Sequence, residues 1–445
     1  MKRILKASAA LILGSSLILS ACSGNTASTD QVQKPDDPES VSGSITVWAW
    51  ALEADFLETM VPEFNEKYPN IEVNINKQGP DQVYQRLITG LAAGEGGQLP
   101  DLVQVEDQRL PSFQNDFPNT FVNLSESGFE EHMGSFTPTK EESIKDEEGN
   151  VIAFPRDVGP VGVFYRKDIF EEAGVEAESI ETWSDYVKAG ETIKDETGAD
   201  MLGLTLNESV PLNRFMIHQQ DAFYFNSNGE LTVGSQETRR AADLMKEFED
   251  KDIMSNVTNW DGRVAGLKNG EEATLPNAVW WYGTMVDQMP ELSGSWGMFP
   301  LPEFEEQGVR AANSGGSSYA IPQVSDQKEA AYLFGEFVST NLDAQLAGLE
   351  NQGLFPSLTE AYDAPIFQEG QEYFDGQSVY ADFADIATEI PEVTYTSDYA
   401  RADNTFNEEI VSMYLYDEDP GNVVDRIEQR LKAGTGRDVA ETDEE

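Results

Sequence analysis

The stretch Ser44–Trp50, SITVWAW, indicates the fold class of this 445-residue chain. Ile45, Val47 and Ala49 alternate with other residues, which is the period-two pattern of a strand with one buried face. Two helical and two strand patterns then follow in turn: a helix with Phe56, Met60 and Phe64, a strand with Ile71, Val73 and Ile75, a helix with Val83, Leu87 and Leu91, and a strand at Leu102–Val105. This β-α-β-α-β order predicts a parallel sheet with helices on both faces.

The rest of the chain continues the alternation. We expect a strand at Val161–Tyr165, a helix at Trp183–Ile193, a hairpin at Phe223–Val233 turning at Asn228-Gly229, an inward-facing helix stripe of Ala241, Leu244 and Phe248 after Ser235, a strand at Trp296–Leu301, and a helix at Asp326–Asn341 capped by Asp326. The body of the chain, roughly 400 residues, is too long for one ordinary hydrophobic core. The sequence therefore predicts an α/β protein with two lobes.

The N-terminal residues have the pattern of an export signal. Three positive charges in Met1–Lys6 precede the apolar run Ala7–Ala21, which is too short to span a bilayer. Leu19-Ser20-Ala21-Cys22 matches the lipobox of bacterial lipoproteins, in which the thiol receives a diacylglycerol group and becomes the first mature residue. Acyl chains such as palmitate would then anchor the protein stably, since two chains suffice. The alternative is an ordinary signal peptide with an incidental cysteine.

These patterns divide the ends of the chain into short functional segments. Ser, Thr, Asp, Gly and Pro dominate residues 23–43, a composition that cannot bury enough apolar surface to order itself. The last residues are polar and acidic and are expected to fray. We predict a signal peptide at 1–21, a flexible linker at 22–43 that begins with lipidated Cys22 at the extracellular face of the cell membrane, and an acidic tail at 436–445.

Charge and cysteine content exclude several classes of partner. The chain has 29 Lys and Arg against 81 Asp and Glu, a formal net charge of −52. Nucleic acid and anionic membrane surfaces are therefore disfavoured partners. Attraction of cationic ligands is the alternative to a solvated acidic surface suited to salty or alkaline surroundings, and we prefer the solvated surface. With one cysteine, an intramolecular disulfide is impossible.

The usual signatures of catalysis are missing. The sequence contains no Gly-x-x-x-x-Gly-Lys-Ser/Thr phosphate loop and no Gly-x-Ser-x-Gly elbow. Its two histidines, His132 and His218, have no second histidine or cysteine at metal-ligand spacing. We expect both histidines to be structural or surface residues, and we predict no metal, no cofactor and no enzymatic activity.

Aromatic and acidic residues instead gather at predicted strand ends, where ligands bind in open α/β sheets. The candidate ligand-binding residues are Trp48, Trp50, Glu106, Asp107, Asp157, Trp280, Trp281, Tyr282, Gly315 and Gly316. Tryptophans also fill cores, and we assign Trp183 and Trp296 to the core because both lie within regular helix or strand patterns. Trp260 stays undecided, as do Gln219, Gln220 and Tyr395.

This combination of residues suits a neutral sugar. A sugar ring has an apolar C–H face, which a flat aromatic side chain can cover, and a rim of hydroxyls. Carboxylates accept strong hydrogen bonds from such hydroxyls. The Gly-Gly pair lets backbone N–H groups approach a ligand closely, since no Cβ intervenes.

At these residues the chain resembles the extracellular solute-binding proteins of sugar ABC transporters, the group that includes maltose-binding protein. Within this group it resembles in particular Gram-positive lipoproteins that bind arabinose, arabino-oligosaccharides or lactose. The matching stretches are ITVWAW, VYQRLITGLAAG, LPDLVQVEDQRLPSF, FPRDVGPVGVFYRKDIFEEAG, TWSDYVKAG, KNGEEATLP, WGMFPLP and NSGGSSYAIP. They run from about residue 44 to about residue 340 in the family's order, whereas the last hundred residues match loosely.

The resemblance implies two lobes that are joined by hinge strands and close on a sugar. Lobe one would hold 44–157 and 306–350, and lobe two 158–305 and 351–435. Sugar contacts would carry over onto the loop at 48–50, the Glu106-Asp107 turn, Asp157, Trp280-Trp281 and Gly315-Gly316. Many relatives have an acidic residue directly after the first Trp-x-Trp, whereas Ala51-Leu52 follows here, so a hydrogen bond from that loop is missing.

The expected function is therefore that of a monomeric, membrane-tethered receptor. It would bind a neutral di- or oligosaccharide, of the arabinose or lactose type, and deliver it to the transmembrane subunits of an ABC permease. Two other interpretations stay open: a secreted glycoside hydrolase that uses a carboxylate pair, and a sugar sensor subunit of a signalling receptor.

Overall fold

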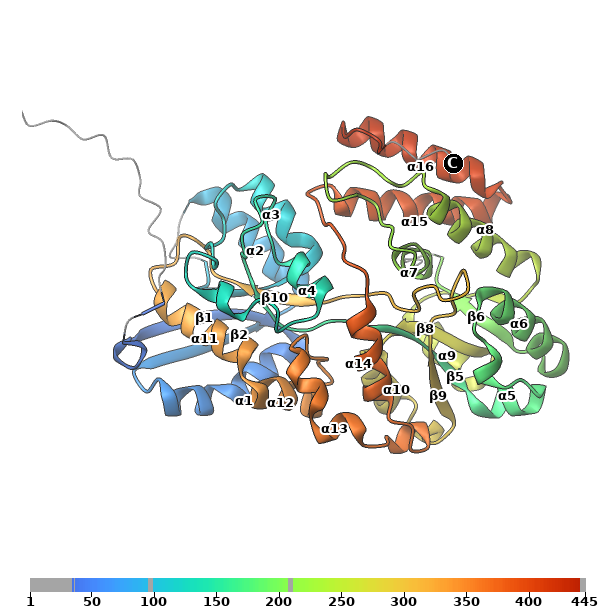
Figure 1. Cartoon of the computed structure of the whole chain (residues 1–445), viewed down its shortest axis with the longest axis horizontal. Helices are drawn as coiled ribbons and strands as arrows, with labels where there is room; N and C mark the ends of the chain where they lie inside the picture. Colours follow the sequence, from blue (N-terminus) through green and yellow to red (C-terminus); the bar gives the residue numbers. More distant parts are fainter. Residues whose placement is uncertain (1–33, 36, 95–98, 207–210, 441–445) are drawn as a thin grey trace, which may run out of the picture. The chain divides into compact units, whose positions relative to one another are not determined.

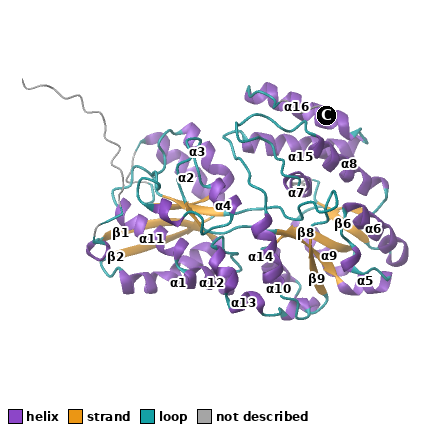
Figure 2. Ribbon diagram, viewed as in Figure 1, coloured by secondary structure: helices purple, strands orange, loops and turns teal. Residues whose placement is uncertain are grey.

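The computed structural model describes residues 34–35, 37–94, 99–206 and 211–440. The predicted signal peptide, Cys22, most of the predicted linker and residues 441–445 of the predicted tail lie outside the described residues. Two five-stranded sheets surrounded by helices make up the described part (Figures 1 and 2). The predicted α/β class is confirmed.

The first sheet has the strand order β2-β1-β3-β10-β4. Its strands are β1 (Gly43–Trp50), β2 (Ile71–Gln78), β3 (Leu102–Glu106), β4 (Phe154–Pro155) and β10 (Ser317–Ala320). β1 pairs in parallel with β2 and β3, while β10 is antiparallel to β3 and β4. Because β1 lies between β2 and β3, right-handed connections place α1 (Ala51–Lys67) and α2 (Pro80–Ala93) on opposite faces of the sheet. The β-α-β-α-β prediction is confirmed, and the carboxyl ends of β1 and β3 meet at one edge.

The core of the first sheet has the composition that the sequence pattern predicts. The helix stripe of Phe56, Met60 and Phe64 and the strand residues Ile45 and Val47 are buried together. Helices α11 (Lys328–Thr340) and α12 (Leu342–Gln352) pack beside α1 on this sheet (Figure 1). Segments far apart in the sequence therefore share one core.

The second sheet has the order β7-β6-β8-β5-β9. Its strands are β5 (Val161–Arg166), β6 (Asp200–Leu204), β7 (Met254–Asn256), β8 (Glu272–Ala278) and β9 (Trp296–Pro300). This part of the chain also contains the helices α6 (Trp183–Thr197), α7 (Pro211–His218), α8 (Gln236–Asp250), α9 (Trp260–Asn269), α10 (Trp281–Gln288), α15 (Tyr399–Tyr416) and α16 (Pro420–Thr435). Trp183 and Trp296 are buried in the cores around this sheet, as predicted.

The chain passes between the two sheets at 156–160, 311–316 and 353–358. These crossing segments are paired with one another by isolated antiparallel bridges, Asp157 with Pro356 and Pro160 with Asn313. Short, paired connections of this kind are the elements at which hinge motions occur. The first segment lies between β4 and β5, the second lies between β9 and β10, and the third follows α12.

The predicted hairpin at Phe223–Val233 is present in a short form, with its turn and one antiparallel bridge, Phe225 with Leu231, and Leu231 also pairs with the C-terminal residues 438–440. The predicted cap of helix α11 is wrong: Gln327, not Asp326, occupies the N-cap position, and its side chain makes no capping hydrogen bond. The hydroxyl of Ser325 accepts from the Gln327 N–H (3.0 Å) and donates to Asp101 (2.6 Å). These contacts hold the backbone before the helix, so the N-cap position falls one residue after the predicted Asp326.

Both ends of the described chain are held more firmly than their composition suggests. Residues 37–43, at the end of the predicted flexible linker, include a 3-10 turn at Pro38–Ser40 and the first residue of β1. The side chain of Asn70 donates to the carbonyl of Glu39 (3.3 Å). The tail pairs with Leu231 as far as Ala440. Contacts with distant residues order these polar segments.

Candidate functional site

A cavity of about 320 Å³ lies beyond the carboxyl end of β3. Residues of α2, of the turn after β3 and of α3 (Leu110–Asp116) line it from the side of the first sheet. Residues of α7 and α15 line it from the side of the second sheet, and the crossing segment contributes Asn313 and Gly315. The cavity therefore draws on elements that are far apart in the chain.

On the first-sheet side, the cavity wall is a network around Glu106. The Tyr84 hydroxyl donates to Glu106 Oε2 (3.0 Å) and accepts from the Glu106 N–H (3.1 Å). Arg109 donates from Nε to the same carboxylate oxygen (2.8 Å), and its guanidinium lies 4.4 Å from the centroid of the Tyr84 ring. Trp50 packs against Tyr84 with ring centroids 5.8 Å apart. Burial, with the nearby charge of Glu106, raises the pKa of Tyr84, so this hydroxyl stays protonated.

On the second-sheet side, the half-buried Arg214 holds the wall together. Arg214 donates to Asp403 Oδ1 (2.8 Å) and to the Tyr399 hydroxyl (3.2 Å). Burial opposes the charged form of Arg214, but Tyr399 and Asp403 outweigh it and raise the pKa of Arg214. Burial raises the pKa of Tyr399 to about 12. Tyr395 stands against Tyr399 edge to face, with centroids 5.2 Å apart. Each arginine of the cavity is thus already paired with a carboxylate.

The crossing segment between the two walls depends on two glycines. Gly315 and Gly316 have φ values of 107° and 106°, a backbone region that residues with a Cβ rarely adopt. A Cβ on Gly316 would lie 2.9 Å from Asp107 Oδ2. Asn313 fixes the segment by accepting from the Gly159 N–H (2.9 Å) and donating to the Gly315 carbonyl (2.8 Å). Gly315 lines the cavity, whereas Gly316 gives the backbone its path beside Asp107.

Three tryptophans form a stack beside this crossing segment. Trp281 is 2% exposed and lies 4.4 Å from Trp260 between ring centroids, with 23° between the ring planes. Trp280 and Trp260 are 42% and 39% exposed. Trp280 Nε1 donates to the Ser314 carbonyl (3.1 Å), which places its indole against the loop that contains Gly315. Trp281 supports the stack, while Trp260 and Trp280 present the accessible aromatic surface.

Asp107 lies in a buried network beside the cavity. Its carboxylate is buried and contacts the Lys140 ammonium, and it accepts from the hydroxyls of Ser318 (2.6 Å) and Ser143 (3.2 Å). Burial raises the pKa of Asp107, and the charge of Lys140 opposes this. All of these partners belong to the protein, so Asp107 shapes the turn after β3 and Glu106 alone faces the cavity.

Other predicted residues lie outside the cavity wall. Trp48 is 2% exposed in the first core, beneath the Arg86 guanidinium at 4.0 Å, and so presents no free face. Asp157 Oδ1 accepts from the N–H (2.7 Å) and hydroxyl (2.8 Å) of Ser317, and it thereby joins the crossing segment 156–160 to the start of β10. Tyr282 packs on Phe374 and Tyr380. Cys22 lies outside the described residues.

Several cavity residues were not predicted from the sequence. They are Tyr84, Arg109, Arg214, Tyr399 and Asp403. The sequence signal for Arg109 was its position in the same turn as Glu106, but nothing local marked the residues of α7 and α15. Of the undecided residues, Tyr395 lines the cavity, whereas Gln219 is buried and donates to the carbonyls of Pro302 (2.8 Å) and Val309 (3.1 Å). Gln220 donates to the Met216 (2.8 Å) and Glu237 (3.1 Å) carbonyls.

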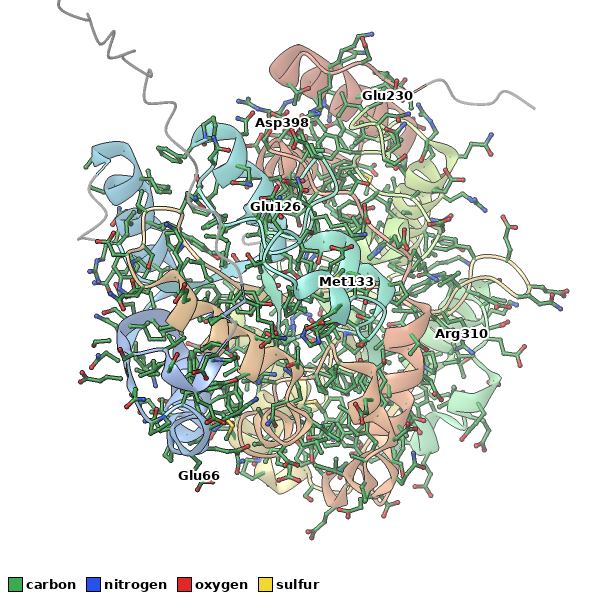
Figure 3. All side chains as sticks on the ribbon, turned by 60° about the vertical axis from the view of Figure 1, so that its left-hand side comes forward. Glu66, Glu126, Met133, Glu230, Arg310 and Asp398 are labelled. Carbon is green, nitrogen blue, oxygen red and sulfur yellow. The ribbon has the colours of Figure 1, made fainter. Side chains whose placement is uncertain are left out.

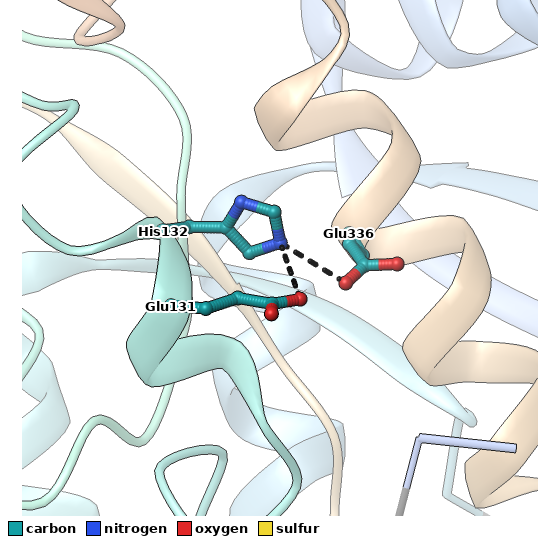
Figure 4. A group of neighbouring side chains, drawn as sticks. All are labelled: Glu131, His132 and Glu336. Atoms are coloured by element: carbon teal, nitrogen blue, oxygen red, sulfur yellow. Dashed lines mark hydrogen bonds and ion pairs between the residues drawn. The ribbon is translucent and has the colours of Figure 1, made fainter.

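Two side-chain clusters in the described chain have the composition of metal sites, and in both a lysine occupies the position of the cation. Glu131, His132 and Glu336 converge in Figure 4. The Lys34 ammonium lies 2.7 Å from Glu131 Oε1 and 3.0 Å from Glu336 Oε1. In the second cluster the Lys246 ammonium lies within 2.8 Å of all three carboxylates, those of Glu249, Asp250 and Asp417.

The second histidine of the chain, His218, is buried behind the cavity. Its Nε2 lies 2.8 Å from the Pro391 carbonyl, and its Nδ1 lies 3.3 Å from the Asn313 nitrogen. Burial lowers the pKa of His218 to about 4, so the imidazole is neutral near pH 7. A neutral ring that donates from Nε2 and accepts at Nδ1 satisfies both contacts. His218 therefore supports the crossing segment from behind.

The family model described as bacterial extracellular solute-binding protein matches residues 50–345, and the chain belongs to this family. It is 29% identical over 365 residues to a lactose-binding protein of Rhizobium radiobacter, and the aligned region covers 80% of this chain and 84% of the relative. It is 27% identical over 388 residues to an arabinooligosaccharide-binding protein of Halalkalibacterium halodurans, with 84% and 86% covered.

Solved structures share the fold. An ABC transporter-associated binding protein from B. animalis subsp. lactis, solved in complex with β-1,6-galactobiose, superposes with a TM-score of 0.72 at 22% identity, covering 90% of this chain and 100% of that one. The two-lobed solute-binding fold predicted from the sequence is confirmed. Within the described part of the chain, every helix is too short or too polar to cross a membrane.

Proposed function

We propose that this protein binds a neutral di- or oligosaccharide between its two sheets and delivers it to an ABC permease. One observation carries the proposal: aromatic side chains line the cavity and its margin, while the cavity's arginines are paired internally. Arg109 is neutralised by Glu106 and Arg214 by Asp403. An uncharged ligand can enter such a site without separating these pairs, whereas an anionic ligand would find both cavity arginines already paired.

The chemistry of the cavity matches the two sides of a sugar ring. The rings of Tyr395 and Tyr399 and the indoles of Trp260 and Trp280 offer flat apolar surfaces. Glu106 keeps a free carboxylate oxygen lone pair for a sugar hydroxyl, and the Gly315 backbone borders the same space. The tryptophan stack and the cavity adjoin the same crossing segment, so a ligand longer than one sugar ring can reach both.

Ligand capture would work by lobe closure. We assign 44–157 and 306–350 to lobe one and 158–305 and 351–435 to lobe two, with the crossing segments as the hinge. A sugar that touches both lobes stabilises the closed form, and the closed form is what a permease recognises. Lipidated Cys22 would hold the monomeric receptor at the extracellular face of the membrane, where the permease subunits are its partners.

The test is calorimetric titration of the mature protein with lactose, arabinose, arabinotriose, maltose, β-1,6-galactobiose and, as a charged contrast, glucose 6-phosphate. We expect at least one neutral sugar to bind saturably and the phosphate ester not to bind. Chromatography after overnight incubation should recover the bound sugar intact. If no neutral sugar binds, or if shorter sugars appear, the proposal is wrong.

Replacing Trp280 with alanine should weaken binding of the best sugar roughly tenfold or more, because an exposed stacking face is lost. The thermal unfolding temperature should change little, since this side chain is 42% exposed. Tyr416→Ala is the matched control: Tyr416 is 73% exposed at the far end of α15, and its loss should leave affinity unchanged. Equal affinity of Trp280→Ala and the wild-type protein would show that the Trp280 indole does not contact the sugar. Trp281 is unsuitable for the test, because its removal would leave a cavity beneath Trp260.

A further inference from the structure

The segment 395–399 is a wall of the cavity, and residues outside the cavity hold it in place. Tyr395 and Tyr399 face the cavity. The carbonyl of Ser397, between them, accepts a hydrogen bond from the hydroxyl of Ser112 (3.3 Å), which lies on α3 at the first-sheet side. This short segment therefore both lines the cavity and meets the opposite wall.

Behind the segment lies Arg437, one residue after the C-cap of α16. Its guanidinium donates from Nε to Asp398 Oδ2 (2.7 Å), from Nη2 to the Ser397 hydroxyl (3.4 Å) and from Nη1 to the Gly229 carbonyl (3.0 Å). The same group lies 5.3 Å from the centroid of the Phe225 ring. Figure 3 labels Asp398 and Glu230, which mark the two segments that Arg437 joins. One side chain thus ties the cavity wall to the loop at 225–231.

The position of Arg437 is itself fixed. The backbone after it pairs with Leu231, whose N–H donates to the Asp438 carbonyl (2.9 Å) and whose carbonyl accepts from Ala440 (2.9 Å). The Arg437 N–H donates to the Thr435 hydroxyl (3.1 Å). Gly229 leaves room for the guanidinium, since a Cβ there would lie 2.9 Å from Arg437 Nη1. Because α15 and α16 also pack on α8, the arginine projects from a well-supported base (Figure 1).

The hydrogen bond between Arg437 and Asp398 takes the place of a side-chain cap at the start of α15. Asp398 occupies the N-cap position of α15, where an aspartate usually accepts from backbone N–H groups of the first turn. Its side chain makes no such capping hydrogen bond and turns to Arg437. The helix beginning with Tyr399 therefore takes its position from the arginine in place of a side-chain cap.

We propose that Arg437 is a positioning residue for ligand binding: through Asp398 and Ser397 it holds the Tyr395–Tyr399 wall at the distance that a bound sugar requires. The inference rests on the proposed function, since it assumes that the cavity is the sugar site. It assigns a role to C-terminal residues that make no contact with the cavity and that composition alone marks as a frayed tail.

The test uses the mature protein and the variants Arg437→Met, Arg437→Lys and Asp398→Asn, titrated with lactose, arabinotriose and β-1,6-galactobiose. The control is Arg401→Met. Arg401 approaches the same carboxylate, with its Nε 4.0 Å from Asp398 Oδ1, but its side chain is 58% exposed. We expect Arg437→Met and Asp398→Asn each to weaken binding about five- to twentyfold, Arg437→Lys to recover part of the loss, and Arg401→Met to change affinity less than twofold.

Two further measurements separate positioning from general stability. Millimolar ethylguanidinium should restore part of the affinity of a further variant, Arg437→Ala, which lacks the side-chain atoms that the ethyl group replaces; a merely destabilised fold would not show this. Amide hydrogen exchange without sugar should rise in 396–402 and stay unchanged in β1. The double variant Arg437→Met/Asp398→Asn should be no weaker than either single variant. Affinities of Arg437→Met and Asp398→Asn within twofold of a sugar-binding wild type would overturn the inference, whereas a wild type that binds no sugar would overturn the proposed function.

Discussion

Replacing Lys140 with methionine is expected to lower the free energy of unfolding by about 3–5 kcal/mol, the largest stability loss that we predict for one substitution. The Lys140 ammonium and the Asp107 carboxylate are each 2% exposed and contact each other directly. Lys140 also donates to the carbonyl of Ser317 (3.1 Å) at the start of β10. Without the ammonium, Asp107 would be an uncompensated buried charge next to the crossing segment.

Denaturant titration of the wild-type protein and of Lys140→Met at pH 7 measures this loss of stability. Lys145→Met is the control, because Lys145 pairs with Glu142 at 3.0 Å on the surface, where ion pairs contribute little. The double variant Lys140→Met/Asp107→Leu should recover much of the stability, since it removes both charges together. A loss below about 1 kcal/mol in Lys140→Met would contradict a structural role for the pair.

Glu272→Gln is expected to stabilise the protein at alkaline pH by about 2–3 kcal/mol. Glu272 begins β8 in the second sheet, and burial raises the pKa of its carboxyl from 4.5 to about 7. The folded protein therefore keeps a proton that the unfolded chain releases above pH 4.5. The contribution of Glu272 to stability declines as the pH rises from 4.5 to about 7 and stays low above that.

Denaturant midpoints at pH 5 and pH 8 compare the protein with the Glu272 carboxyl protonated and with it ionised. The gap between Glu272→Gln and the wild type should be small at pH 5 and large at pH 8. Glu271→Gln changes the exposed neighbouring residue and should show no such dependence. A gap of equal size at both pH values would mean that Glu272 is ionised in the folded protein throughout this range.

The fold was largely predictable because its signal is local. The alternation of Ile45, Val47 and Ala49, and the four-residue spacing of Phe56, Met60 and Phe64, report directly which face of an element is buried. The errors fall where a distant segment supplies a partner: residues 438–440, which were expected to fray, pair with Leu231, and Asp101 holds Ser325 next to the expected cap at Asp326.

The candidate site was predictable only in part. Glu106 and Gly315 line the cavity, Trp280 lies against the crossing segment, and Trp50 packs on the cavity residue Tyr84. Glu106 and Asp107 are adjacent in the sequence and equally acidic, yet one faces the cavity and the other is buried against Lys140. No spacing rule distinguishes them, because the direction of each side chain depends on the path of the turn after β3.

By itself, the sequence determined the α/β class, the order of helices and strands and the resemblance to sugar-binding receptors, since hydrophobic periodicity and short motifs are properties of neighbouring residues. Only the tertiary structure decided which side chains share the cavity. Arg214, Tyr399 and Asp403 meet Glu106 there, and Arg437 supports them from the end of the chain. The physical reason is that hydrogen bonds and ion pairs select partners by position in space, which strand order and the crossing segments fix.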